Sequence, residues 1–155
     1  TTAVLKGLDN LNDKILLIAT TNLYERFDKA LVRRFDSVID FNRYSREDLM
    51  EISEIILNYY MNKFESIGRN MRLFKKIISL FETIPYPGDL KNLIKTSLAF
   101  SKPNDEYDYL RRLYTSVTNN KNKELKILQN QGFTIREIEI LTGISKSQVS
   151  RELKE

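Results

Sequence analysis

The sequence contains no cysteine and no histidine, and this excludes several classes of protein at once. Disulfide bonds, zinc sites built on thiolates or imidazoles, and Ser-His or Cys-His catalytic pairs each need one of these residues. Any chemistry must therefore come from carboxylates, lysine, arginine, asparagine or hydroxyl groups.

Long apolar runs are also absent. No uninterrupted stretch is long enough to span a membrane, and the start, residues 1–6, lacks the basic-then-apolar order of a secretion signal. We therefore expect a cytoplasmic protein with no membrane partner. The 155 residues, 41% of them hydrophobic, suffice for one ordinary domain or two small ones.

Positive charge is unevenly distributed. Residues 1–109 hold 16 basic and 16 acidic side chains, whereas residues 110–155 hold nine basic and five acidic ones. The whole excess of +4 thus lies in the last third, which favours a polyanionic partner for that segment. An ordinary solvated surface is the alternative explanation.

The first part of the chain has a mixed pattern. Val4, Leu5 and Leu8 repeat with helical spacing, and residues 14–19 then form the short apolar run of a strand buried on both faces. Residues 37–41 predict a second short strand, with a turn of helix over 30–34 between the two. Because two strands do not make a stable parallel sheet, they must complete a sheet supplied from outside this chain or pair between molecules.

From Ser45 onward the pattern is helical. Ser45 and Asp48 occupy N-cap and N3 positions, and four amphipathic helices follow, separated by Gly68, by residues 85–88 and by residues 102–104. Their apolar faces carry Leu49, Ile52, Ile56, Tyr59 and Phe64; then Met71, Phe74, Ile77, Ile78 and Phe81; then Leu90, Leu93, Ile94 and Leu98; and then Tyr107, Leu110, Leu113, Tyr114 and Val117. Residues 118–123 are polar and lack periodicity, so we place a linker over 119–123.

Two short motifs could carry chemistry in the first part. The strand ending in Thr20-Thr21-Asn22 would leave Asn22 at a sheet edge, where α/β proteins gather ligands; the alternative is a simple turn. About a dozen residues later, Arg33 and Arg34 offer guanidinium forks suited to phosphate oxygens. For them the alternative is a surface pair.

The order and spacing of these motifs resemble the second region of homology of AAA+ ATPases. The resemblance runs from Gly7-Leu8-Asp9-Asn10 through Ile18-Ala19-Thr20-Thr21-Asn22 to Ala30-Leu31-Val32-Arg33-Arg34-Phe35-Asp36. The resemblance implies that Asn22 is sensor 1, which orients the water attacking the γ-phosphate of ATP. It also implies that Arg34, with Arg33, is the arginine finger reaching the nucleotide of a neighbouring subunit. The helices after Ser45 would be the family's lid.

A further similarity to the family lies at Tyr86-Pro87-Gly88-Asp89-Leu90-Lys91, which is similar to the start of the lid helix that carries sensor 2. Lys91 stands where the family pattern has arginine, which keeps the charge but loses the bidentate fork. A solvent-facing lysine is the alternative. The Gly-x-x-x-x-Gly-Lys-Ser/Thr loop and the acidic magnesium-binding pair of the family, which lie upstream of this region, are not in the sequence. We therefore expect a fragment covering about half of an ATPase module, with ATP and Mg bound by the full-length protein and neither bound tightly by this chain alone.

The last part of the chain indicates a helix-turn-helix. Thr134-Ile135-Arg136-Glu137 and Ser145-Lys146-Ser147-Gln148 both read as capping boxes, and Gly143 stands between them where a left-handed turn is needed. The segment resembles the DNA-binding motif of bacterial proteins, whose second helix enters the major groove. That helix would expose the candidate DNA-binding residues Lys146, Ser147, Gln148, Ser150 and Arg151. A helical hairpin for protein contacts is the alternative.

The sequence thus predicts a mainly α protein. We expect the remnant of an α/β AAA+ core with two short strands over 1–44, a four-helix lid over 45–118, a linker over 119–123 and a helix-turn-helix over 124–155. As part of a bacterial, phage or plasmid ATPase that forms a ring with copies of itself, it would act on duplex DNA in replication, partition or transposition. The two alternatives are a nucleotide-independent DNA-binding adaptor with a degenerate ATPase core, and a protein-remodelling AAA+ with a protein-docking tail.

Overall fold

The computed structural model of the chain describes residues 2–12, 14–41, 43–63, 68–119 and 124–154. In these ranges every regular element is a helix, as the mainly α prediction requires. The chain divides into two compact units, Thr1–Phe41 and Asn42–Glu155, which are described separately. None of the helices in the described ranges is both long and apolar enough to cross a membrane.

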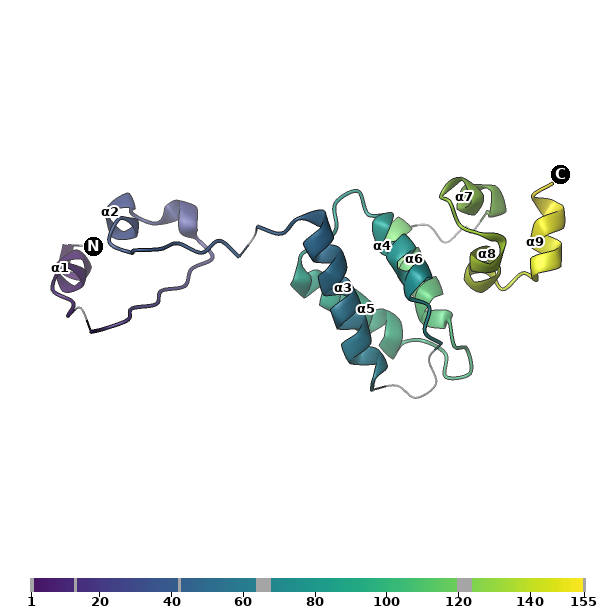
Figure 1. Ribbon diagram of the computed structural model, residues 1–155, viewed down its shortest axis with the longest axis horizontal. Helices are drawn as coiled ribbons and strands as arrows, with labels where there is room; N and C mark the ends of the chain where they lie inside the picture. Colours follow the sequence, from purple (N-terminus) through teal and green to yellow (C-terminus); the bar gives the residue numbers. More distant parts are fainter. Residues whose placement is uncertain (1, 13, 42, 64–67, 120–123, 155) are drawn as a thin grey trace. The chain divides into compact units, whose positions relative to one another are not determined.

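The first unit has little regular structure (Figure 1). Helix α1 (Thr2–Asp9) forms where the helical spacing predicted one, and it is followed by the short 3-10 helix η1 (Tyr24–Arg26) and the single turn of α2 (Lys29–Val32). Asp28 is the N-cap residue of α2, and its carboxylate accepts the backbone N–H of Ala30 at 2.8 Å.

The two predicted strands of this unit are not formed. Residues 15–19 and 37–41 lie outside any strand, and their apolar side chains face solvent; Leu16 is 85% exposed and Ile39 is 73% exposed. A strand is held by hydrogen bonds to a neighbouring strand, and the described part of this unit supplies no such neighbour. The described residues therefore do not form the two buried strands that the sequence predicted.

The second unit begins with the four predicted helices, which we call the lid. They are α3 (Arg46–Met61), α4 (Met71–Ser79), α5 (Pro87–Ala99) and α6 (Asp108–Thr118). The Ser45–Asp48 capping box is present, with Ser45 Oγ accepting the Asp48 N–H at 3.1 Å and Asp48 Oδ2 accepting the Ser45 N–H at 2.8 Å. Helix α3 ends at Met61, well before Gly68, and the predicted position of Phe64 lies outside the described residues.

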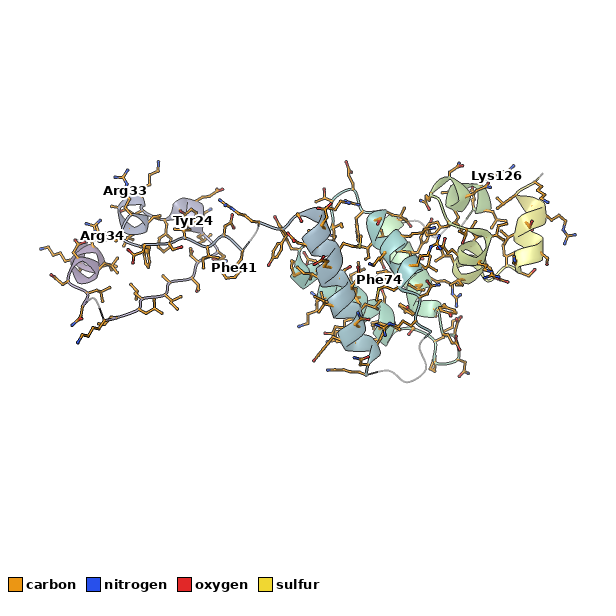
Figure 2. All side chains as sticks on the ribbon, in the orientation of Figure 1. Tyr24, Arg33, Arg34, Phe41, Phe74 and Lys126 are labelled. Carbon is orange, nitrogen blue, oxygen red and sulfur yellow. The ribbon has the colours of Figure 1, made fainter. Side chains whose placement is uncertain are left out.

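The core of the lid is built largely from the predicted apolar faces, with Leu57, Leu73 and Tyr109 added to them. Phe74 is fully buried among the lid helices (Figure 2). Leu57, Leu73, Ile77, Ile78, Leu90, Ile94, Leu98, Tyr109, Leu110 and Leu113 are also nearly or fully buried. Tyr59 is 57% exposed, so its place on the apolar face of α3 was predicted wrongly.

Three short helices complete the second unit, and we call them the tail: α7 (Leu125–Asn130), α8 (Ile135–Thr142) and α9 (Lys146–Glu152). They follow the predicted linker, of which residues 120–123 lie outside the described residues. Leu128, Phe133, Ile138, Leu141 and Val149 of the tail belong to the same buried cluster as the lid core. Lid and tail therefore share one hydrophobic core.

Candidate functional sites

Asn22 lies in a bend of the first unit. The side chain is exposed, and the preceding Thr21 hydroxyl accepts the backbone N–H of Leu23 at 3.0 Å, just before η1 begins. This local bond forms the turn that a Thr-Asn pair favours. The role of Asn22 as sensor 1 stays a prediction.

Arg34 is held by an aspartate from the other end of the first unit. Its Nε donates to Asp9 Oδ1 at 2.6 Å, a second nitrogen donates to Asp9 Oδ2 at 3.2 Å, and the third donates to the Ala30 carbonyl at 2.8 Å. This is the two-point geometry in which a guanidinium binds a carboxylate most strongly. The hydrogen bonds from Arg34 hold the pKa of Asp9 below its usual value.

Arg33 differs from Arg34 in the exposure of its side chain. It is the C-cap residue of α2, and its side chain is exposed to solvent (Figure 2). Arg34, in contrast, keeps a third of its side chain exposed while its fork is engaged by Asp9. In the separate chain, Arg33 is thus the more accessible of the two guanidinium groups.

Lys91 belongs to the second unit. It is exposed, near the start of α5, whose first turn contains Pro87 and Asp89 as the sequence predicted. Its charge adds to the effect of Lys63, whose hydrogen bond to the Tyr59 hydroxyl at 2.9 Å is the main cause that lowers the pKa of that phenol. A role for Lys91 in nucleotide binding stays a prediction.

The tail has the helix, turn and helix that the capping signals predict. Thr134 Oγ1 accepts the Glu137 N–H at 3.3 Å and Glu137 Oε2 accepts the Thr134 N–H at 2.8 Å, so this capping box is present. Gly143 follows α8 with φ of 77°, the left-handed conformation that glycine adopts without strain. The turn that separates α8 from α9 thus has the predicted chemistry.

The second capping box was predicted wrongly. Ser145 precedes α9 but makes no capping hydrogen bond, and Gln148 donates to Glu152 Oε1 at 2.9 Å instead of reaching back to Ser145. The backbone N–H of Lys146 donates to Glu139 Oε1 of α8 at 3.0 Å. A carboxylate is a strong acceptor for a backbone N–H at a helix start, so α8 stabilises the first turn of α9 at Lys146, two residues before the Gln148 N–H that a capping box would have used.

Helix α9 presents a polar surface. Val149 is buried, while Lys146, Ser147, Gln148 and Arg151 are exposed and Ser150 is half-buried. The exposed side chains are those chosen from the sequence as DNA contacts. Their arrangement along one helix, with a cation near each end, suits phosphates flanking base edges.

Sequence reasoning missed α7 and the bonds that join the tail to the lid. Leu125 and Leu128 were the only signal for α7, which carries the exposed Lys126 (Figure 2). Lys76 of α4 bonds to Glu137 of α8, and Arg111 of α6 bonds to the Ile140 carbonyl. These partners lie 61 and 29 residues apart in the sequence, and no local sequence pattern predicts such pairs.

Comparison with known proteins yields one finding. Residues 2–43 match the family model described as ATPase family associated with various cellular activities (AAA). The matched segment contains Asn22, Arg33 and Arg34, and the match relates this part of the chain to that family. No curated protein and no solved structure matches the chain.

Proposed function

We propose that the chain is the C-terminal part of an AAA+ ATPase that assembles into a ring and acts on duplex DNA through its tail. The observation that carries the proposal is the family match over residues 2–43, the segment in which the sequence placed both phosphate-directed motifs. The exposed apolar side chains of residues 15–19 and 37–41 support it, because they need a covering partner such as the rest of an α/β core.

The groups in this chain suit nucleotide phosphates only in part. An asparagine amide and two guanidinium groups can bind a water molecule and phosphate oxygens, but the sequence has no glycine-rich loop with its lysine to cradle a triphosphate and its magnesium. Asn22 would hold the attacking water, and Arg33 or Arg34 would face the nucleotide of the adjacent subunit. ATP and Mg would bind the assembled protein, and this chain alone would bind neither tightly.

The pair between Asp9 and Arg34 bears on which arginine acts. A phosphate contact by Arg34 requires that its fork exchange the Asp9 carboxylate for phosphate oxygens, whereas Arg33 is already exposed. A finger supplied across an interface stabilises charge on the transferring phosphoryl group and is worth about 10³ to 10⁵ in rate. Loss of the acting arginine should therefore suppress turnover while sparing ATP affinity.

Mixing of variant subunits in the ATPase tests which arginine acts across the subunit interface. Arg34→Ala subunits are mixed with subunits inactivated in the phosphate-binding loop, and turnover absent from either alone should return with increasing concentration. Arg33→Ala is tested in parallel, and Asp9→Asn serves as the control that frees Arg34 without removing it. If both arginine variants keep normal turnover, or if mixing restores none, the finger assignment is wrong. An inactive Arg33→Ala with a normal Arg34→Ala would assign the role to Arg33.

The tail would bind DNA weakly as a monomer, because one helix-turn-helix makes few phosphate contacts. Each cation that neutralises a phosphate contributes a slope of about −0.9 to the dependence of log affinity on log salt. Removing Lys146 and Arg151 together should therefore weaken binding and reduce the slope by about 2.

Fluorescence anisotropy with a labelled duplex at several salt concentrations measures both quantities. The matched control is Lys95→Ala with Lys102→Ala, which removes the same charge from exposed side chains of the lid; the hydrogen bond that Lys102 donates to Asp108 uses its backbone N–H and survives. Equal effects of the two double variants would mean that only net charge matters. An unchanged affinity after loss of Lys146 and Arg151 would leave the tail as a protein-docking hairpin.

A further inference from the structure

Glu137 joins the tail to the lid through a buried ion pair. The residue is 5% exposed, and its Oε2 accepts a hydrogen bond from Lys76 Nζ of α4 at 2.6 Å. Lys76 also donates to the Gly132 carbonyl at 2.9 Å, and Arg72 lies 3.6 Å from Oε1. A buried carboxylate is stable only with such partners. Two elements of the tail, α8 and the turn before it, are therefore bound to one helix of the lid.

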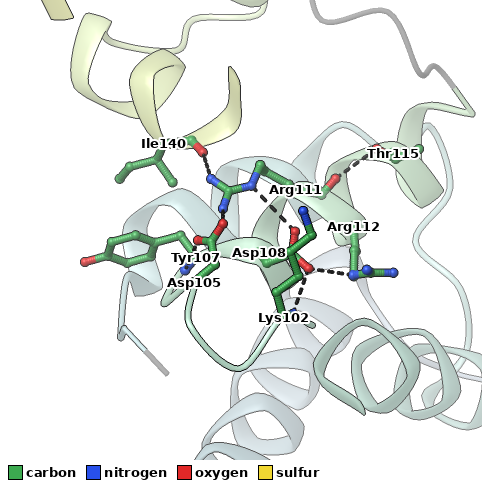
Figure 3. A network of polar contacts seen from close by, with 8 residues as sticks. All are labelled: Lys102, Asp105, Tyr107, Asp108, Arg111, Arg112, Thr115 and Ile140. Carbon is green, nitrogen blue, oxygen red and sulfur yellow. Dashed lines mark hydrogen bonds and ion pairs between the residues drawn. The ribbon is translucent and has the colours of Figure 1, made fainter. Parts of the chain in front are cut away.

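Arg111 makes the second link (Figure 3). Its guanidinium reaches Asp105 and lies 3.7 Å from Asp108, and it donates at 2.5 Å to the carbonyl of Ile140 near the C-terminal end of α8. The two aspartates come from the lid and hold the guanidinium in place, so its remaining donor is directed at the tail. A cation near the end of a helix also stabilises its unpaired carbonyl groups.

The tail is too small to have a core of its own. It spans about 30 residues, and below about 40 residues a chain rarely folds without a metal, a disulfide or a partner. The lid supplies that partner through Tyr114 of α6, whose ring lies 5.9 Å from Phe133 edge-on and whose hydroxyl donates to Gln131 at 2.9 Å. Helix α9 is then bound to α8 through the Lys146–Glu139 hydrogen bond.

From these contacts we infer that lid and tail form one rigid body, in which Lys76 and Arg111 are positioning residues that set the direction of α9. The inference rests on the proposed function in that α9 reads DNA. The consequence is mechanical, because any rotation of the lid would carry the DNA-reading helix with it. A tail on a flexible tether would instead search for DNA independently of the lid.

The absence of cysteine allows a direct distance measurement. Cysteines introduced at Lys95 in α5 and Glu152 in α9, both exposed, carry spin labels, and double electron–electron resonance gives the distribution of distances between them without DNA. We expect one narrow distance in the labelled chain. Lys76→Met combined with Arg111→Met should abolish that narrow distance in favour of a broad distribution.

Neighbouring residues provide matched controls. Lys75 pairs with Glu54 at 2.6 Å and Arg112 pairs with Asp108 at 2.7 Å, so both make their ion pairs inside the lid. The double variant Lys75→Met with Arg112→Met removes the same charges one position away and should keep the narrow distance. If the double variant at Lys76 and Arg111 loses its helical circular dichroism, the two single substitutions, each removing one link, replace it.

A broad distribution in the labelled chain without further substitution would overturn the rigid body. A narrow distance that survives loss of Lys76 and Arg111 would overturn their positioning role. The distance measurement contains no DNA, so its outcome does not depend on whether the tail binds DNA. The anisotropy measurement with the Lys146 and Arg151 variant, in turn, does not depend on whether lid and tail form a rigid body.

Discussion

Replacing Lys76 with methionine should lower the stability of the second unit by far more than an exposed charge would. Methionine keeps most of the apolar stem of lysine, so the change removes the ammonium group and leaves the packing. Glu137, whose side chain is 7% exposed, then loses the cation 2.6 Å away. Removing one partner of a fully buried pair costs about 3–5 kcal/mol.

The expected cost lies below that range for structural reasons. The Lys76 side chain is 29% exposed, so water reaches the vacated position, and Arg72 and the Thr134 N–H still contact the carboxylate. We therefore expect about 2 kcal/mol, which corresponds to a fall in melting temperature of about 8 °C for a unit of this size. Denaturant unfolding followed by far-UV circular dichroism measures the free energy of unfolding.

Lys75→Met is the control, because it breaks an ion pair between the more exposed Lys75 and Glu54 and should cost about 0.2–1 kcal/mol. A double-mutant cycle with Glu137→Gln, which retains the capping oxygen, isolates the pair, and we expect a coupling energy of about 1–2 kcal/mol. The reasoning is refuted if Lys76→Met costs no more than Lys75→Met, or if the cycle shows no coupling.

Three further predictions follow from single groups. Burial alone would raise the pKa of Glu137, but the hydrogen bonds from Lys76 and Thr134 outweigh it and lower the pKa below the ordinary 4.5. The ionised Glu137 therefore contributes to the free energy of unfolding above pH 4.5, and this contribution is lost as the pH falls below that value. The difference in stability between the unsubstituted chain and Glu137→Gln should then shrink on acidification. Burial raises the pKa of Tyr109 from 10.0 to about 12, so stability should fall between these pH values and Tyr109→Phe should fall less in alkaline unfolding curves. Gly143→Ala forces a side chain into φ of 77° and should cost about 1–2 kcal/mol in thermal unfolding, whereas Gly88→Ala, where an added Cβ meets nothing within 4 Å, should not destabilise.

The lid could be predicted from the sequence because its signals are local. The Ser45–Asp48 capping box and the proline at the start of α5 each act within one helical turn, and the apolar spacing at Phe74, Ile77 and Ile78 marks the buried face directly. Gly143 is another local case, since only its own backbone angle decides the turn. Such signals need no knowledge of the rest of the fold.

Features that depend on contacts with residues distant in the sequence were predicted wrongly or not at all. The apolar run at residues 15–19 predicted a buried strand, yet in the described part of the first unit these residues are exposed and form no strand, because a strand needs a neighbouring strand to bond to. Ser145 looked like a capping residue, but Glu139 of the preceding helix binds the N–H of Lys146. A hydrogen bond from the preceding helix cannot be predicted from the spacing of capping residues alone.

The sequence by itself thus determined the helices of the lid, the turn of the tail and the residue types that the proposal assigns to phosphate and DNA contacts. Tertiary structure alone decided how those residues are used. It paired Arg34 with Asp9, 25 residues away, and left Arg33 exposed. It also placed Lys76 against Glu137, so that a charge buried on the tail is compensated by the lid. Ion pairs between distant residues form only after the chain has folded, because folding brings the partners together and removes the water that would otherwise solvate them.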